Sequence, residues 1–131
     1  MGSDFVYGGD GNDLIIGTQD GVADNYYGGN SATDTGTADK IDYTAVTSNI
    51  LLTSGTNVTN SSSGADILSG IEIFDSGSGD DTLTAGSAGM TIYGNSGIDK
   101  ITGGSGNDLL YGDNVGNTHG TTDGANTQVV S

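Results

Sequence analysis

The chain has no cysteine and no proline, and its 131 residues include only two basic side chains, Lys40 and Lys100. Without cysteine, it can form neither a disulfide nor a zinc site built on thiolates. Two lysines cannot make the positive patch that neutralises phosphates, so we expect no nucleic-acid partner. No apolar run approaches the about 18 residues of a membrane-spanning helix, and the first residues, MGSDFVYGG, lack the regions of a Sec signal peptide. We therefore expect no membrane span and no Sec leader.

Aspartate and glycine dominate the residues that are present. Among 17 acidic residues only Glu72 is a glutamate, the formal net charge is −15, and there are 25 glycines. Aspartate tolerates turns and glycine at this density opposes helices, so we expect turns and strands and no helix. With 32% hydrophobic residues, the composition alone fits a disordered acidic linker as well as it fits a folded domain. The excess of carboxylates indicates cations as partners, because a counter-charge relieves their repulsion.

A nine-residue repeat favours an ordered chain over a linker. Its complete copies are Gly8–Ile16, GGDGNDLII, and Gly103–Tyr111, GGSGNDLLY, with glycine first and fourth, aspartate sixth and a large apolar residue eighth. Ser76–Thr84 and Gly94–Thr102 come close to this pattern. Looser copies extend it over most of residues 2–120: Gly17–Tyr27, Gly28–Asp42, Gly64–Ser69, Ala85–Tyr93, in which Met90 replaces the aspartate, and Gly112–Gly120, in which Asn117 and His119 replace the aspartate and the aliphatic.

The repeat has a direct geometric interpretation. The last three residues of each unit form a minimal strand whose eighth-position side chain points inward. Glycine at the first and fourth positions permits the positive φ angles that a tight turn needs. Two units then make one flattened turn of about 18 residues, with neighbouring strands about 4.8 Å apart. Aspartates that lie two units apart should therefore stack on the same edge.

Stacked carboxylates favour a divalent cation between the turns. Calcium accepts about six to eight oxygen ligands at about 2.3–2.6 Å, which aspartates and the carbonyls of glycine turns can supply. An all-oxygen ligand set disfavours zinc and copper, and magnesium demands a stricter octahedron. One inward aliphatic per nine residues is a small core against the entropy of ordering the backbone. We therefore expect folding to depend on calcium, with several ions bound.

The repeat is absent from the middle of the chain, between Tyr43 and Ser63. There we predict a short strand at Asn49–Thr53 and a polar loop at Gly55–Ser63. After the pattern returns, Ile71 and Ile73 alternate with polar neighbours, as residues of a strand do. We predict that this part is a β excursion from the repeat array.

These segments divide the chain into one domain and a tail. The domain covers 1–120, with repeat blocks at 1–42 and 76–120 on either side of the excursion at 43–75. Residues 121–131 form a polar tail, which we expect to be mobile unless something docks it.

The motifs resemble the RTX (repeats-in-toxin) haemolysin-type calcium-binding nonapeptide repeat family. The resemblance implies an all-β fold, a right-handed parallel β-roll (β-solenoid) with calcium between stacked turns. In the family, the first six residues of each repeat bind calcium and the last three form the strand. The sixth-position aspartate is shared between turns two repeats apart.

Carried over to this chain, the resemblance implies specific metal ligands. Asp81 should pair with Asp99, whereas Asp108 faces Met90 and so lacks a partner carboxylate. The other implied pairs are Asp4 with Asp24 and Asp13 with Asp39, and the implied turn glycines are Gly8, Gly11, Gly77, Gly79, Gly94, Gly97, Gly103 and Gly106.

Residues beside the motifs have two interpretations each. The polar residues that flank the turns either assist calcium binding or cap the turns; they are Asp10, Asn12, Asp80 and Asn107. The tyrosines at the ninth position face outward, and form either a partner surface or packing over neighbouring strands; they are Tyr7, Tyr27, Tyr93 and Tyr111. His119 is interpreted as an exposed loop residue, because the chain has no cysteine or second histidine to join it.

An enzymatic function is not expected. The sequence has no HExxH motif, no cysteine nucleophile and no GxSxG elbow. Two function classes remain, both implying secretion or display at the cell surface. One is a structural or assembly unit of a surface protein, with self-association or the parent protein's other domains as partners. The other is a calcium-triggered folding and type I secretion module of a secreted enzyme or toxin.

Overall fold

The computed structural model describes residues 2–30, 36–60, 64–112 and 127–129. Within these ranges the chain is all-β, as predicted, and no helix occurs. The same ranges contain no helix long and apolar enough to cross a membrane. The predictions for Asn117 and His119, and for most of the tail, lie outside the described residues.

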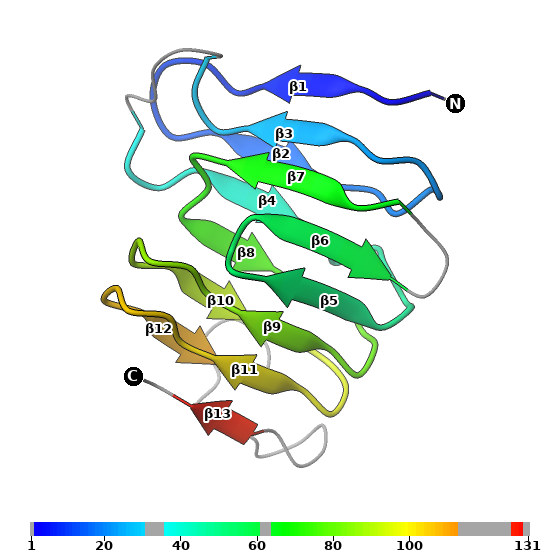
Figure 1. Cartoon of the computed structure of the whole chain (residues 1–131), viewed down its shortest axis with the longest axis vertical. Coiled ribbons are helices and arrows are strands. Elements are labelled where there is room, and N and C mark those ends of the chain that lie inside the picture. The colour runs from blue at the N-terminus through cyan, green and yellow to red at the C-terminus, as the bar shows by residue number, and fades with distance from the viewer. Residues whose placement is uncertain (1, 31–35, 61–63, 113–126, 130–131) are drawn as a thin grey trace.

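Most strands are three residues long, as the nonapeptide predicts, and they stack along the long axis of the molecule (Figure 1). The strands are β1 (Phe5–Tyr7), β2 (Leu14–Ile16), β3 (Asn25–Tyr27), β4 (Lys40–Asp42), β5 (Ile50–Thr53), β6 (Asn57–Asn60), β7 (Asp66–Ser69), β8 (Ile73–Asp75), β9 (Thr82–Thr84), β10 (Thr91–Tyr93), β11 (Lys100–Thr102), β12 (Leu109–Tyr111) and β13 (Thr127–Val129).

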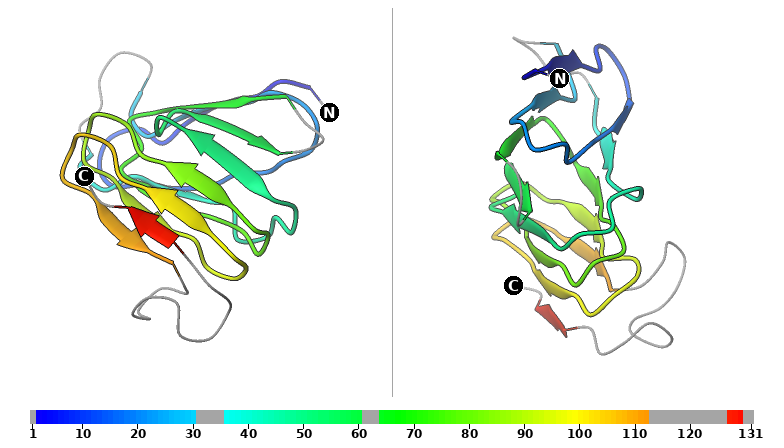
Figure 2. Two further views of the ribbon diagram at one scale, coloured as in Figure 1. Left: turned by 60° about the horizontal axis from the view of Figure 1, so that its bottom comes forward. Right: turned by 90° about the vertical axis from the view of Figure 1, so that its right-hand side faces the viewer.

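The strands form two sheets, and the chain alternates between them outside the β5–β7 segment. The first sheet has eight strands in the order β1-β3-β7-β6-β5-β9-β11-β13, and the second has five in the order β12-β10-β8-β4-β2. The two sheets face each other (Figure 2). Neighbouring strands are parallel except for β6, which runs antiparallel to β5 and β7. Successive turns of the chain therefore stack along two edges of the molecule.

The core lies between the sheets and is built from eighth-position residues. Side chains of both sheets belong to one buried cluster. Val6, on β1, is partly buried against it. The predicted inward residues that are buried are Ile15, Tyr26, Ile41, Leu68, Leu83, Ile92, Ile101 and Leu110. The inward periodicity seen in the sequence is thus confirmed along the array.

The excursion contains a β-hairpin where we expected a polar loop. The strand predicted at Asn49–Thr53 is confirmed as β5, but Asn57–Asn60 forms β6, so the loop prediction was wrong. The chain reverses at Ser54 and Gly55, whose φ angles are 53° and 69°. Two positive φ angles are the requirement of a type I′ hairpin turn. The turn signal was short, and the polar composition around it concealed a strand.

The strand predicted around Ile71 and Ile73 is present in part as β8, the last strand of the excursion. Phe74 of β8 is buried in the hydrophobic core, whereas Ile73 is half-buried and Ile71 is partly buried against the core. Phe74 pairs with Ile41 and Ile92 in the register of the second sheet. This register places Glu72 immediately before the strand, where repeats carry their sixth-position aspartate.

The ninth-position tyrosines pack over neighbouring strands. Tyr7 and Tyr27 are stacked with ring centroids 4.8 Å apart, and Tyr93 and Tyr111 are stacked at 4.9 Å. Stacking across adjacent parallel strands stabilises the sheets from outside.

Candidate metal centre

An acidic residue comes directly before or at the start of most strands, and these residues stack along the two edges. We call the turns that lead into the eight-stranded sheet the first edge, and those that lead into the five-stranded sheet the second edge. The sixth-position residues of the first edge are Asp4, Asp24, Asp66, Asp81 and Asp99, and those of the second edge are Asp13, Asp39, Glu72, Met90 and Asp108.

One hydrogen bond repeats along both edges. The backbone N–H of a sixth-position residue donates to the carboxylate of the residue one turn later. The distances for the predicted pairs are 2.8 Å from Asp4 to Asp24 Oδ1, 2.7 Å from Asp13 to Asp39 Oδ1 and 2.9 Å from Asp81 to Asp99 Oδ1. The structure thus brings each predicted pair together on adjacent turns. Calcium ligation by these residues stays a prediction.

We call this repeating hydrogen bond the ladder bond. Two further acidic residues accept a ladder bond and were not among the predicted ligands. Asp66 Oδ1 accepts from the N–H of Asp24 at 3.0 Å, and Glu72 Oε2 accepts from that of Asp39 at 3.0 Å. The sequence contained a signal for Asp66, because it precedes the inward Leu68 in a partial repeat. Glu72 carried no such signal, because it lies outside the repeat units found in the sequence.

Oxygen atoms converge around Asp39 on the second edge, where its Oδ2 is buried. A Cβ atom added to Gly28 would lie 1.8 Å from the carbonyl oxygen of Gly70 and 2.5 Å from Asp39 Oδ2. A Cβ atom added to Gly36 would lie 2.4 Å from the carbonyl oxygen of Gly11 and 2.6 Å from Asp39 Oδ2. Glycine at these positions therefore lets carbonyls of the preceding and following turns share a small space with one carboxylate.

Asp13, one turn earlier on this edge, has a similar surrounding. A Cβ atom added to Gly8 would lie 2.2 Å from the carbonyl oxygen of Gly28 and 2.7 Å from Asp13 Oδ2. Asp13 Oδ2 is buried and accepts no hydrogen bond from the described residues. A buried carboxylate oxygen without a donor is costly unless a cation or water compensates it.

The Asp81–Asp99 turns are built differently at their two ends. Asp99 Oδ2 is buried, and a Cβ atom added to Gly94 would lie 2.5 Å from it and 2.7 Å from the carbonyl oxygen of Gly112. Asp81 instead accepts hydrogen bonds on both oxygens, from the N–H of Ile50 at 2.7 Å and from the Ser76 hydroxyl. Burial raises the pKa of Asp81 above its usual value despite these donors.

Asp108 faces Met90, as predicted. Asp108 Oδ1 accepts from the N–H of Met90 at 3.0 Å, and Oδ2 accepts from that of Gly104 at 2.8 Å. The turn before it supplies no second carboxylate, since methionine occupies the sixth position. Both oxygens of Asp108 therefore have backbone donors.

Two residues beside the motifs bridge the turns as backbone caps. Asn12 Oδ1 accepts from the N–H of Thr37 at 3.1 Å, and Asp80 Oδ1 accepts from the N–H of Ile98 at 2.8 Å. These contacts support the turn-cap interpretation for both residues.

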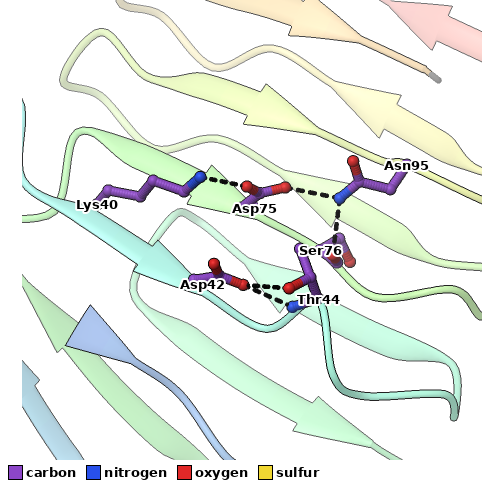
Figure 3. A network of polar contacts seen from close by, with 6 residues as sticks. All are labelled: Lys40, Asp42, Thr44, Asp75, Ser76 and Asn95. Carbon is purple, nitrogen blue, oxygen red and sulfur yellow. Dashed lines mark hydrogen bonds and ion pairs between the residues drawn. The ribbon is translucent and has the colours of Figure 1, made fainter. Parts of the chain in front are cut away.

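A separate acidic group on the second sheet is satisfied by the protein itself (Figure 3). Asp75 forms an ion pair with Lys40 and accepts from Asn95 Nδ2 at 2.6 Å. Asn95 Nδ2 also donates to the carbonyl oxygen of Ser76 at 2.8 Å. Asp75 therefore has counter-charge and donors without a metal.

The donor chemistry of the two edges fits calcium bound partly by the backbone. In the described ranges, no group of three His, Cys, Asp or Glu side chains converges to hold a metal. A cation would therefore need carbonyl oxygens beside the carboxylates, which is a ligand set that calcium accepts. The residues that would hold it best are Asp13 and Asp39 with the carbonyls of Gly11, Gly28 and Gly70.

Comparison with known proteins gave one match. A model of the RTX calcium-binding nonapeptide repeat matches in 4 copies, over residues 2–21, 68–88 and 91–118, which together exceed half of the chain. Asp39 and Asp66 lie between the matched stretches. Searches of curated proteins and of solved structures gave no match.

Proposed function

Because the chain belongs to the family of RTX calcium-binding nonapeptide repeats, we propose that it is a calcium-binding right-handed parallel β-roll of a secreted or surface-exposed protein. It folds when calcium binds and serves a structural or assembly role, without catalysis. The observation that carries this proposal is the oxygen cradle around Asp39, where a buried carboxylate meets carbonyls of two neighbouring turns.

The energetics of buried carboxylates explain why calcium should control folding. Asp39 and Asp99 are 0% and 1% exposed, and the chain carries a net charge of −15. Removing ionised carboxylates from water is costly unless an opposite charge joins them. An ion present at about 100 times its dissociation constant stabilises the folded state by about 2.7 kcal/mol per site. Several such sites can shift a chain with a small core from unfolded to folded.

Circular dichroism tests the calcium requirement. The purified chain is recorded in EDTA, then with calcium, and then with magnesium at the same concentration as a control. We expect strand signal only with calcium, because magnesium demands a stricter octahedron. A strand signal that is unchanged in EDTA would contradict the proposal.

The assembly role is supported by the outermost strands of the two sheets. β1 and β2 are terminal in the strand orders, and Phe5, Leu14 and Ile16 on them are 62%, 62% and 59% exposed. Edge strands with exposed apolar side chains are templates for association. Light scattering during calcium addition measures this directly, and growth of the particle mass is expected. A monomer at every calcium concentration would instead favour the folding and secretion module.

A further inference from the structure

The Asp66 carboxylate is surrounded by hydrogen-bond donors. Its Oδ1 accepts from the N–H of Asp24 at 3.0 Å. Its Oδ2 accepts from Gln19 Nε2 at 2.6 Å and from the Tyr43 hydroxyl at 3.1 Å. The side chain is 1% exposed, so these donors, and not bulk water, surround the carboxylate.

Asp24, one turn earlier on the first edge, is satisfied in the same way. Its Oδ1 accepts from the N–H of Asp4 at 2.8 Å, and its Oδ2 accepts from the Tyr26 hydroxyl at 3.2 Å. Two successive carboxylates therefore have both oxygens occupied by donors of the chain.

Asp39 on the second edge provides the contrast. Its Oδ1 makes the same ladder bond, from the N–H of Asp13, but its Oδ2 lies beside the carbonyls of Gly11 and Gly70. Carbonyl oxygens are acceptors, and a cation can bind between them and a carboxylate. N–H and O–H donors instead turn their positive ends toward the carboxylate, which fills its lone pairs and repels a cation.

Packing holds the Tyr43 hydroxyl, one of the donors to Asp66, in place. The Tyr43 ring contacts Phe74 at a centroid distance of 5.5 Å and Tyr26 edge-on at 6.4 Å. A Cβ atom added to Gly17 would lie 2.4 Å from the Tyr43 ring, so the backbone also confines it. Moving the hydroxyl away to admit an ion would require the aromatic cluster to repack.

We propose that the Asp24–Asp66 turns bind no calcium, and that Gln19, Tyr43 and Tyr26 supply the donors that replace the ion there. This inference rests on the proposed calcium binding of the other turns. It implies that the chain binds fewer calcium ions than it has turns with a sixth-position acidic residue. It also implies that this part of the stack gains no stability from calcium.

Isothermal calorimetry with calcium tests the inference on a matched pair of variants. Asp39→Asn and Asp66→Asn change buried aspartates that make the same ladder bond. We expect Asp39→Asn to bind at least one ion fewer than the unchanged chain, and Asp66→Asn to bind the same number. Tyr43→Phe keeps the ring and removes one donor, so it decides the question if Asp66→Asn does not fold. We expect it to bind the same number of ions and to unfold at a lower temperature in saturating calcium.

The outcomes separate the inference from the proposed function. If the unchanged chain binds no calcium, the proposed function fails. If it binds calcium but Asp66→Asn or Tyr43→Phe binds one ion fewer, the inference is overturned and the function stands. An unchanged ion number in Asp39→Asn would also overturn the contrast on which the inference depends.

Discussion

Replacing Gly28 by alanine tests the oxygen cradle at its tightest point. The added Cβ atom would lie 1.8 Å from the carbonyl oxygen of Gly70 and 2.5 Å from Asp39 Oδ2. Both are well inside normal van der Waals separation, and the first is a backbone atom that cannot swing aside. The turn must therefore open, which moves two of the oxygens that would bind calcium away from each other.

The expected magnitude follows from the size of this overlap. Extra methyl groups in well-packed sites cost about 1–3 kcal/mol when backbone has to shift. The backbone at Gly28 has to move further than a close van der Waals contact would require. We therefore place the loss of unfolding free energy at the upper end of this range, about 2–3 kcal/mol. For a chain of this size that corresponds to a fall of about 6–12 °C in melting temperature. Calcium affinity should fall as well, because the ligand oxygens separate.

Thermal unfolding in saturating calcium, followed by circular dichroism, measures the effect. Gly2→Ala is the control, because no heavy atom lies within 4 Å of its added Cβ. We expect the control to have the same melting temperature as the unchanged chain. A Gly28→Ala chain that melts with the control and binds calcium equally well would refute the argument that this glycine is required by close approach.

Two further substitutions address the hairpin and the ion pair. Ser54→Asn should raise the unfolding free energy by about 0.5–1 kcal/mol, because Asn-Gly suits the positive φ of 53° at this position better than Ser-Gly, and a lower midpoint in urea would contradict the type I′ assignment. Lys40→Met should lower the unfolding free energy by about 1–3 kcal/mol, because it leaves the carboxylate of Asp75, which is 3% exposed, without its counter-charge. Lys100→Met is the control, because Lys100 is exposed, and equal urea midpoints for the two variants would contradict the prediction.

The repeat array could be predicted from sequence because its signals are local. Spacing alone identified the inward residue of each unit, including Tyr26 and Ile41 in the stretched copies, and both are buried. It also identified which aspartates lie on adjacent turns, because successive repeat units alternate between the two edges. The contacts of Asp81 with Asp99, and of Asp13 with Asp39, follow from that regularity.

The middle of the chain could not be predicted because its structure depends on long-range contacts. β6 is mostly polar and is held between β5 and β7 by strand pairing, which no local sequence pattern predicts. The register of β8 depends on Phe74 meeting Ile41 and Ile92 from repeats far away in the sequence. The donors on Asp66 come from Gln19 and Tyr43, which are 47 and 23 residues distant.

The interrupted repeat and the donor-filled turns have a common structural cause. Between β3 and β9 the first sheet holds three strands, whereas between β4 and β10 the second sheet holds only β8. The two largest fully buried side chains among the described residues, Tyr43 and Phe74, pack against each other in this part of the stack. Because tyrosine fills this space, its hydroxyl reaches Asp66 on the first edge. The same insertion that breaks the repeat therefore brings in the hydroxyl donor that, in our proposal, makes calcium unnecessary at Asp66. The turns without calcium should accordingly lie where the first sheet holds the extra strands, and the calcium-binding turns should lie on either side of them.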